Sequence, residues 1–355
     1  MSAAHIVTAE SSSAVGNRPG LRMHEVPCPL CGSTHSSKLM EGPDWYYDVP
    51  GVFVVVRCAE CGHSYLNPCP VDEDLARCYP SGYSAHRSGQ PGAEPAPATP
   101  AVAKRPWYLA GWFRKIPGPR WLYYWLTDAK SQYVPPGPAG RRALEMGCAT
   151  GDFLLRLKQE GWEAEGVDIV ESAVEVARSR GFNVQLGDPT TVELPSVAYD
   201  AVFAWMVVEH LPRPQQAVEK AMAALQPGGW FCFSVPNFAS WERRLWGSHW
   251  KGADLPRHLQ HFTPAILKSL LANAGFTDIR IMHQPSFLNW LGSHGSWLKA
   301  RNAESRLGEK LLRWFYDNPP LWTYFVFGPW ANLSAALKQG GRLTVLTRKP
   351  VGERR

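Results

Sequence analysis

From residue 141 onward, short apolar stretches of strand character alternate with amphipathic stretches of helical character. The predicted strands cover residues 142–147, 163–169, 183–188, 200–208, 230–237, 277–284 and 340–349. The predicted helices cover residues 152–160, 171–180, 214–225 and 263–275. Strands joined through helices run parallel, because the chain must cross back before it enters the next strand. The alternation therefore predicts an α/β fold, with a doubly wound, seven-stranded, mostly parallel sheet and helices on both of its faces.

Composition divides the rest of the chain. Residues 1–22 are small and polar, which predicts a disordered tail. Residues 23–79 form a cysteine-bearing module, and residues 80–106 are rich in Pro, Ala, Gly and Ser, with too little apolar surface to offset the entropy of ordering them. We therefore expect a linker at 80–106 and one large domain over 107–355.

Three stretches of this domain lie outside the alternation. Residues 238–262 and 285–339 have the length of insertions that usually cover a substrate site, so we expect them to form lids. Residues 107–133 combine aromatic and basic side chains. They predict a partly helical cap on the core, or a surface that contacts a membrane interface or a lipid-like substrate.

A tight turn, GCATG at residues 147–151, joins the first predicted strand to the first helix. In doubly wound sheets the ligand binds beyond the carboxyl ends of the strands. A dinucleotide site would need G-x-G-x-x-G, which presents pyrophosphate to the helix N-terminus. Here Ala149 replaces the middle glycine, and Glu145 and Asp152 add negative charge. We therefore expect a ligand that carries positive charge. S-adenosylmethionine (SAM) fits, because it has a sulfonium, an ammonium and no phosphate.

With the acids that follow it, LEMGCATG resembles the first motif of class I SAM-dependent methyltransferases of the small-molecule type. The resemblance runs from Arg141 to about Lys349 and implies a Rossmann-like fold. It implies that the turn lines the methionine moiety of SAM, through Gly147, Cys148, Ala149 and Gly151. It further implies that Glu145 orients the ammonium.

The later strands extend this resemblance. Asp168, with Ile169 after it, matches the acid that accepts hydrogen bonds from the ribose hydroxyls. Asp188 would lie near the adenine amino group, and Trp205 and Met206 would lie beside the cofactor.

Three histidines fall where this family places the rim of its active site: His210, His258 and His261. A hydroxyl acceptor benefits from a general base, and histidine is suited to that role near neutral pH. PRHLQHFT, at residues 256–263, also resembles a recurring motif of this methyltransferase group. Each ring has an alternative role, which is to hydrogen-bond a lid to the sheet.

Two C-x2-C pairs, Cys28 with Cys31 and Cys58 with Cys61, are each followed by glycine. Zinc takes four soft ligands in a tetrahedron, and two such knuckles supply them. This spacing predicts a zinc site, with disulfides or iron as alternatives. The module resembles the zinc-ribbon-like segment that precedes many bacterial methyltransferases. Its role is structural, or it shapes the acceptor site, or it grips RNA.

The N-terminus has no apolar stretch of signal-peptide type, which predicts a cytoplasmic protein, with peripheral contact to the inner face of the membrane as an option. The net charge of +6 is modest and scattered, which argues against nucleic acid as the main partner. The leading hypothesis is a SAM-dependent methyltransferase acting on a hydroxyl of a sugar, a lipid-linked glycan or a secondary metabolite. The alternatives are an RNA methyltransferase and a zinc-bearing scaffold without activity. Nothing in the residues distinguishes carbon or nitrogen acceptors, or defines the oligomeric state.

Overall fold

The structure is a computed structural model that describes residues 6–7, 20–79, 132–316 and 319–351. A seven-stranded sheet forms its centre, with the strand order β13-β14-β11-β10-β7-β8-β9. The strands are β7 (Arg142–Met146), β8 (Glu163–Asp168), β9 (Asn183–Leu186), β10 (Tyr199–Trp205), β11 (Leu225–Pro236), β13 (Thr277–Gln284) and β14 (Arg342–Arg348). All neighbours pair in parallel except β14, which is antiparallel to both β11 and β13. The predicted mostly parallel sheet of seven strands is confirmed.

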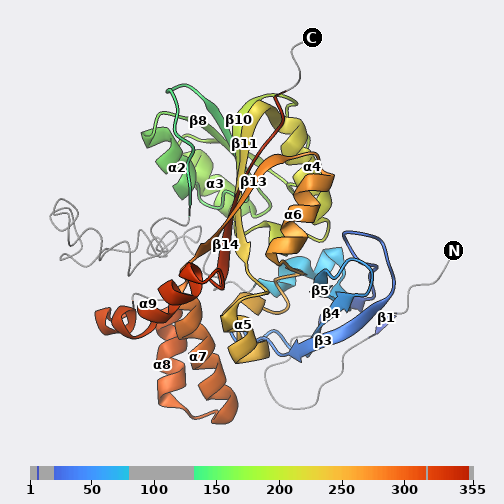
Figure 1. The fold of residues 1–355 in the computed structure, drawn as a ribbon, viewed down its shortest axis with the longest axis vertical. Coiled ribbons are helices and arrows are strands. Elements are labelled where there is room, and N and C mark those ends of the chain that lie inside the picture. Colours follow the sequence, from blue (N-terminus) through green and yellow to red (C-terminus); the bar gives the residue numbers. More distant parts are fainter. Residues whose placement is uncertain (1–5, 8–19, 80–131, 317–318, 352–355) are drawn as a thin grey trace.

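Helices cover both faces of this sheet (Figure 1). On one face lie α2 (Asp152–Gln159) and α3 (Glu171–Ser179), and on the other lie α4 (Pro214–Ala224) and α6 (Pro264–Asn273). The period of two along a strand explains the two cores. On β10, Phe203 packs in the core beneath α2, whereas Val202 packs in the core shared with α4 and α6.

Strand order reverses between β7 and β10, since β8 and β11 lie on their opposite sides. At such a reversal the connections leave in opposite directions and open a crevice at the carboxyl ends of the two strands. The turn after β7 and the residues after β10 therefore face the same crevice.

The N-terminal module consists of two small sheets. One has the order β12-β5-β4-β3 and the other has the order β1-β2-β6. These strands are β1 (Ile6–Val7), β2 (Met23–His24), β3 (Ser36–Gly42), β4 (Phe53–Cys58), β5 (Ser64–Leu66), β6 (Cys69–Pro70) and β12 (Gln260–His261), and the helix η1 (Asp72–Cys78) follows them. The strand β12 comes from the large domain and pairs with β5 in antiparallel orientation. The large domain therefore completes a sheet of the module.

Within the segment 1–22, for which we predict a disordered tail, the structure describes residues 6–7 and 20–22. Ile6–Val7 pairs with Met23–His24, and Arg22 donates two side-chain hydrogen bonds to Asp74. The pairing partners lie far along the chain, so local composition could not indicate them. The rest of this segment, the predicted linker at 80–106 and most of the aromatic stretch at 107–133 lie outside the described residues.

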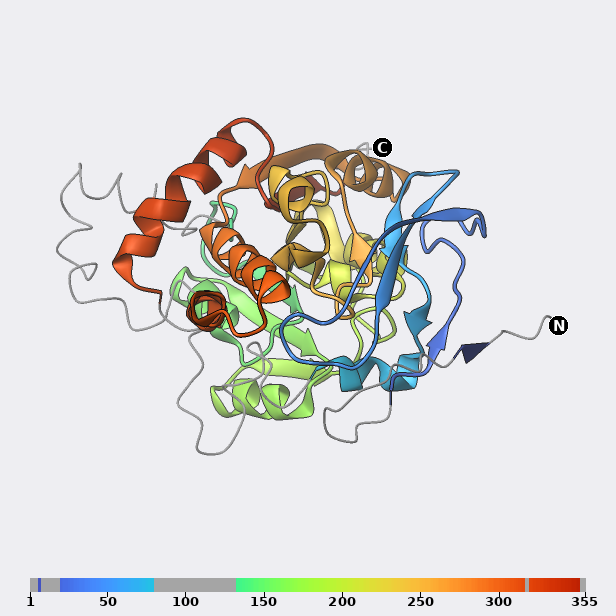
Figure 2. The same ribbon diagram turned by 90° about the horizontal axis from the view of Figure 1, so that it is seen from below.

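Both predicted insertions lie beyond the carboxyl ends of the parallel strands (Figures 1 and 2). The first contains α5 (Trp241–Trp246), η5 (Gly247–His249), η6 (Lys251–Ala253) and β12. Its side chains Trp246, Trp250 and Leu255 share one buried core with residues of the module. The second contains α7 (Phe287–Arg301), α8 (Arg306–Tyr316) and α9 (Leu321–Ala336). No helix in the described part of the chain has the length and apolar character needed to cross a bilayer.

Candidate functional site

The glycine turn after β7 closes tightly on the neighbouring strand. The backbone N–H groups of Gly147 and Cys148 both donate to the carbonyl of Val167, at 2.7 and 3.1 Å. Gly147 has a φ of +73°, and a Cβ there would collide with Val207 beyond β10. Ala149 also lies in the left-handed region, at a φ of +46°. The turn thus keeps the bend that a glycine would favour, although this position carries a side chain.

Asp168, at the end of β8, holds this turn in place. Its Oδ2 accepts from the N–H of Ala149 at 2.7 Å, and its Oδ1 accepts from the N–H of Val170 at 2.9 Å. A carboxylate oxygen has two lone pairs, so each oxygen retains one that can accept from a ribose hydroxyl. The sequence predicts that Asp168 binds the ligand, but it gave no sign of these two hydrogen bonds to the backbone.

Glu145, near the end of β7, is a buried acid that lacks a partner at one oxygen. The residue is 4% exposed, and its Oε2 has no hydrogen-bond partner among the described residues. Burial raises the pKa of Glu145 well above its usual value, and the nearby charges of Asp168 and Asp152 raise it further. A cationic group bound at the turn would relieve both the unsatisfied oxygen and the repulsion.

The predicted adenine-side residues differ in their surroundings. Asp188 accepts from Thr190 through one oxygen, from the backbone N–H at 2.7 Å and the hydroxyl at 2.8 Å. Ile169 is 66% exposed beside the turn, which leaves an apolar surface for a flat ligand to cover. Trp205 is buried under α2 and packs edge-on against Phe153, with ring centroids 5.4 Å apart.

Met206 follows Trp205 in the left-handed region, at a φ of +57°, and its N–H donates to the carbonyl of Ser234. This bend redirects the chain at the end of β10. It leads into η4 (Val208–His210), which carries Glu209 and His210.

The side chains of His210 and His258 are in contact, although the two residues are 48 positions apart in the sequence. Their ring centroids are 4.6 Å apart in an edge-to-face arrangement. The Nδ1 atom of His258 lies 2.9 Å from the carbonyl of Gly252. The Nδ1 atom of His210 lies 3.1 Å from the carbonyl of Arg257 and 2.9 Å from the Tyr79 hydroxyl of the module. Burial, and then His210, lower the pKa of His258 well below its usual value.

His261 has different surroundings from these two histidines. It lies in β12, its ring centroid is 4.9 Å from that of Phe238, and its backbone pairs with Ser64 of β5. Burial, together with His63 and Arg243, lowers the pKa of His261 to about 3. The ring is therefore neutral and held at the seam between the module and the large domain.

A buried ion cluster, which sequence reasoning missed, joins the same two parts. Arg257 forms two hydrogen bonds of 2.7 Å with the carboxylate of Asp44 in the module. It also donates to Asp254 at 3.0 Å, and Asp254 accepts from Lys251 at 2.7 Å. The Arg257 and Asp44 side chains are fully buried. The signal for this cluster lay in PRH at residues 256–258, but its partner is 213 positions away.

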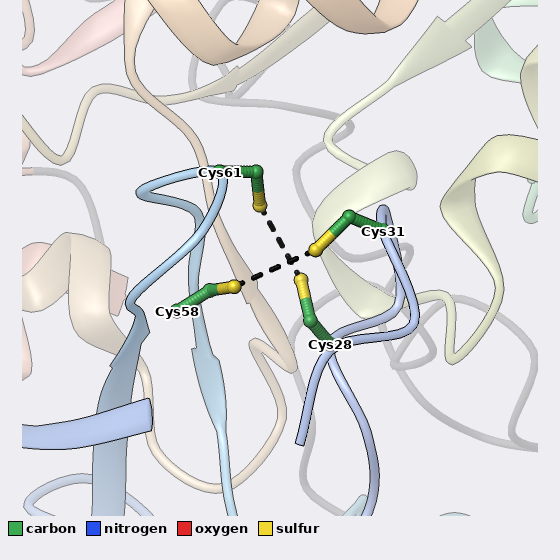
Figure 3. A group of neighbouring side chains, drawn as sticks. All are labelled: Cys28, Cys31, Cys58 and Cys61. Atoms are coloured by element: carbon green, nitrogen blue, oxygen red, sulfur yellow. Dashed lines mark hydrogen bonds between the residues drawn. The ribbon is translucent and has the colours of Figure 1, made fainter. Parts of the chain in front are cut away.

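The side chains of the four predicted zinc ligands point toward one another in the module (Figure 3). The sulfurs of Cys28 and Cys61 are 3.5 Å apart, as are those of Cys31 and Cys58. Sulfurs of a disulfide would be about 2.05 Å apart, whereas those of a tetrahedral Zn–S4 site, with bonds of about 2.3 Å, would be about 3.8 Å apart. The donor set and spacing therefore fit one zinc ion.

The family comparison agrees with the fold. Residues 120–281 match the model of a methyltransferase domain. A probable S-adenosylmethionine-dependent methyltransferase of Mycolicibacterium smegmatis is 32% identical over 168 residues, which is 46% of this chain and 63% of that protein. The ubiquinone biosynthesis O-methyltransferase of Bordetella avium is 32% identical over 105 residues, which is 28% of this chain and 44% of that protein. The chain thus spans about half the length of the curated relatives it matches.

Solved structures give more distant likenesses. Phosphoethanolamine N-methyltransferase 2 of Haemonchus contortus, in complex with SAM, has 16% identity and a TM-score of 0.44, with 64% of this chain and 52% of that chain covered. A possible histamine N-methyltransferase of Thermotoga maritima has 18% identity and a TM-score of 0.43, with 65% and 93% covered. The domain match and the SAM-dependent relatives support a SAM-dependent methyltransferase domain in this chain.

Proposed function

We propose that the chain transfers the methyl group of SAM to a hydroxyl oxygen of a small-molecule acceptor. The observation that carries this proposal is the Glu145 carboxylate, which is buried beside the glycine turn with an unpartnered oxygen. A site for an anionic phosphate would not place an acid there, whereas the ammonium of SAM would satisfy it.

The residues of the turn fit the remaining parts of SAM. The backbone of Gly147, Cys148, Ala149 and Gly151 would line the methionine moiety, since a Cβ at Gly147 would fill the space beside Val207. Asp168 would accept from the ribose hydroxyls with its remaining lone pairs, and Ile169 would cover one side of the ligand. Asp188 would accept from the adenine amino group, and Met206 would flank the cofactor at the end of β10.

Bound SAM supplies an electrophilic methyl group on its sulfonium. The chain then has to hold the acceptor oxygen in line with that methyl group and exclude water. A hydroxyl reacts faster when its proton is drawn away, and we infer that His210 and His258 act on this hydroxyl. The position of His210 after β10 and its edge-to-face contact with His258 of the first insertion support a location of both rings at the crevice that Glu145 faces. We propose a structural role for His261, because its ring is packed at the seam of β12, and a packing role for Trp205.

The relatives suggest oxygen as the acceptor atom, because they include the ubiquinone biosynthesis O-methyltransferase and a malonyl-[acyl-carrier protein] O-methyltransferase. The second insertion suggests an apolar or lipid-linked acceptor. On α9 the exposed large side chains include Trp322, Phe325, Val326 and Trp330, and the helix contains no charged residue. We propose that this face contacts a lipid chain or the cytoplasmic surface of a membrane.

We propose that zinc at Cys28, Cys31, Cys58 and Cys61 has a structural role within a module covering residues 23–79. The module contributes Tyr79 to the neighbourhood of His210 and Asp44 to the buried ion cluster. By binding the two cysteine pairs, zinc would stabilise the module, and with it the surface that contacts the large domain through Tyr79 and Asp44. On this proposal the methyltransferase domain covers residues 107–355.

The experiment that tests this proposal combines calorimetric SAM binding with a transfer assay. We would measure formation of S-adenosylhomocysteine with a panel of phenolic, glycosidic and lipid-linked hydroxyl compounds, with RNA as a separate arm. Saturable SAM binding and turnover with a hydroxyl compound would support the proposal. Failure to bind SAM would refute it, and turnover with RNA alone would replace the small-molecule acceptor with RNA.

A further inference from the structure

A second group of metal-binding side chains lies apart from the four cysteines. Glu209, His210 and His258 each offer a ligand atom, and these atoms all lie within 4.8 Å of one another. Glu209 and His210 belong to η4, which follows β10, and His258 comes from the first insertion. Glu209 and His258 are buried, and His210 is partly exposed.

The Glu209 carboxylate shows that this group is incomplete as it stands. The residue is 0% exposed, and neither of its oxygens has a hydrogen-bond partner among the described residues. Burying a carboxylate without hydrogen-bond partners costs free energy, so proteins normally pair such a group with a cation or a metal ion. Arg342 contributes positive charge in the vicinity, but it does not satisfy either oxygen by a hydrogen bond.

The histidine rings are oriented as metal ligands usually are. A carbonyl oxygen can only accept, so the contact of His258 Nδ1 with the Gly252 carbonyl, at 2.9 Å, places the proton on Nδ1. The contact of His210 Nδ1 with the Arg257 carbonyl, at 3.1 Å, has the same consequence. In both rings the lone pair is then on Nε2. A ligating histidine almost always donates its other N–H to a carbonyl, a carboxylate or water in this way.

We propose that Glu209, His210 and His258 bind a divalent transition-metal ion, for which zinc is the first probe. Two imidazole nitrogens and one carboxylate are a donor set of catalytic zinc sites, and three protein ligands leave a coordination position open. This inference rests on the proposed function, because that position would take the hydroxyl oxygen of the acceptor. A metal ion lowers the pKa of an oxygen bound to it, so the two histidines would act on the hydroxyl by holding the metal rather than by accepting the proton themselves.

The buried ion cluster behind His258 supports the geometry. Asp254 Oδ2 lies 3.8 Å from His258 Nε2, and Asp254 is itself held by Arg257 and Lys251. The loop that carries His258 is therefore fixed from the module side. Tyr79 of the module also contacts His210 Nδ1 at 2.9 Å, so the module orients both ligand-bearing segments.

The test measures zinc by mass spectrometry in the full chain after incubation with excess zinc and desalting. Glu209→Gln and His258→Ala should each hold one zinc equivalent less than the wild type, because each loses one of three ligands. The matched control is Glu242→Gln. Glu242 is also 0% exposed and has a partnerless Oε1, but its Oε2 accepts from Trp250 and it belongs to neither group of metal-binding side chains. This control should retain the wild-type content.

Cobalt substitution separates the two sites by their spectra. The cysteine site should give thiolate-to-cobalt charge-transfer bands that persist in every variant, whereas the second site should contribute only ligand-field bands that Glu209→Gln removes. Circular dichroism and calorimetric SAM binding, run on the same samples, show whether each variant is folded and whether the proposed function holds. Equal metal content in the wild type and in folded Glu209→Gln would overturn this inference, even if SAM binds. Loss of SAM binding in the wild type would instead overturn the proposed function.

Discussion

Replacing Glu145 with glutamine removes a buried charge at the glycine turn and keeps the shape of the side chain. In the free protein, burial, together with Asp168 and Asp152, raises the pKa of Glu145 well above the usual 4.5. The ammonium of SAM favours the ionised form, so binding should release a proton. Because the complex holds fewer protons than the free protein, affinity for SAM should rise with pH from about 4.5 up to the raised pKa. The titration of an α-amino group, at about 7.7–8.0, limits the rise at the upper end.

The size of the effect follows from the contact that is lost. A hydrogen bond between charged groups contributes about 1.5–3 kcal/mol. Its loss corresponds to a dissociation constant roughly 10 to 150 times larger. Glutamine can still accept a hydrogen bond from the ammonium, so the lower end of this range is the expectation for Glu145→Gln. Release of the proton should disappear completely, since glutamine does not titrate.

The assay is calorimetry in buffers of different ionisation enthalpy, run between about pH 5.5 and 7.5, below the α-amino titration. The slope of the binding enthalpy against the buffer enthalpy gives the number of protons released. The control is Glu165→Gln, which removes an acid of β8 that pairs with Arg142 at 2.7 Å, away from the turn. Proton release by Glu145→Gln equal to that of the wild type would refute the assignment of Glu145 to the ammonium.

Four further predictions concern the turn and the two parts of the chain. Asp168→Ala should weaken SAM binding by about 1–3 kcal/mol, because charged hydrogen bonds are lost; an unchanged dissociation constant in calorimetry would remove Asp168 from the site. Ala149→Gly should raise the free energy of unfolding by about 0.5–1 kcal/mol in urea titrations, since alanine is strained at a φ of +46°; a loss of stability would contradict this. Asp44→Asn should lower the free energy of unfolding by about 3 kcal/mol, the lower end of the range for breaking a buried pair, because Arg257 would remain buried with Asp254 as its remaining charged partner; a change below 1 kcal/mol would mean that the pair is not buried in solution. Chelation of zinc should lower the melting temperature and make the module sensitive to proteases, and equal melting curves with and without a chelator would argue against a structural metal.

The central sheet was predictable because its signals are local. Each strand and helix has its own periodicity, and the start of α6 has a local signal as well: the Thr263 hydroxyl accepts from the N–H of Ile266, as an N-cap should. The crevice followed from topology, because parallel strands present their carboxyl ends at one edge. For that reason we could expect Glu145, Asp168 and His210 to lie in one region.

The union of the module with the large domain was not predictable. It depends on pairs such as Arg257 with Asp44 and Tyr79 with His210, which are 213 and 131 positions apart. No periodicity indicates such pairs, since each partner has ordinary neighbours in the sequence. The same limit applies to Glu209, because its sequence context does not show that both of its oxygens would be buried without partners.

Because β5 pairs with β12, the small sheet of the module can be completed only after the ribosome has made residues 260–261. His63, next to β5, and Gln260 of β12 meet through a hydrogen bond of 2.9 Å across 197 positions. At about 5–20 residues per second, a ribosome would need roughly 10–40 s to make the chain between them. During that time β5 is an uncovered edge strand of the sheet β5-β4-β3 in the nascent chain. Such an edge can pair with the wrong strand. A chain interrupted before residue 260 would retain this exposed edge for its lifetime.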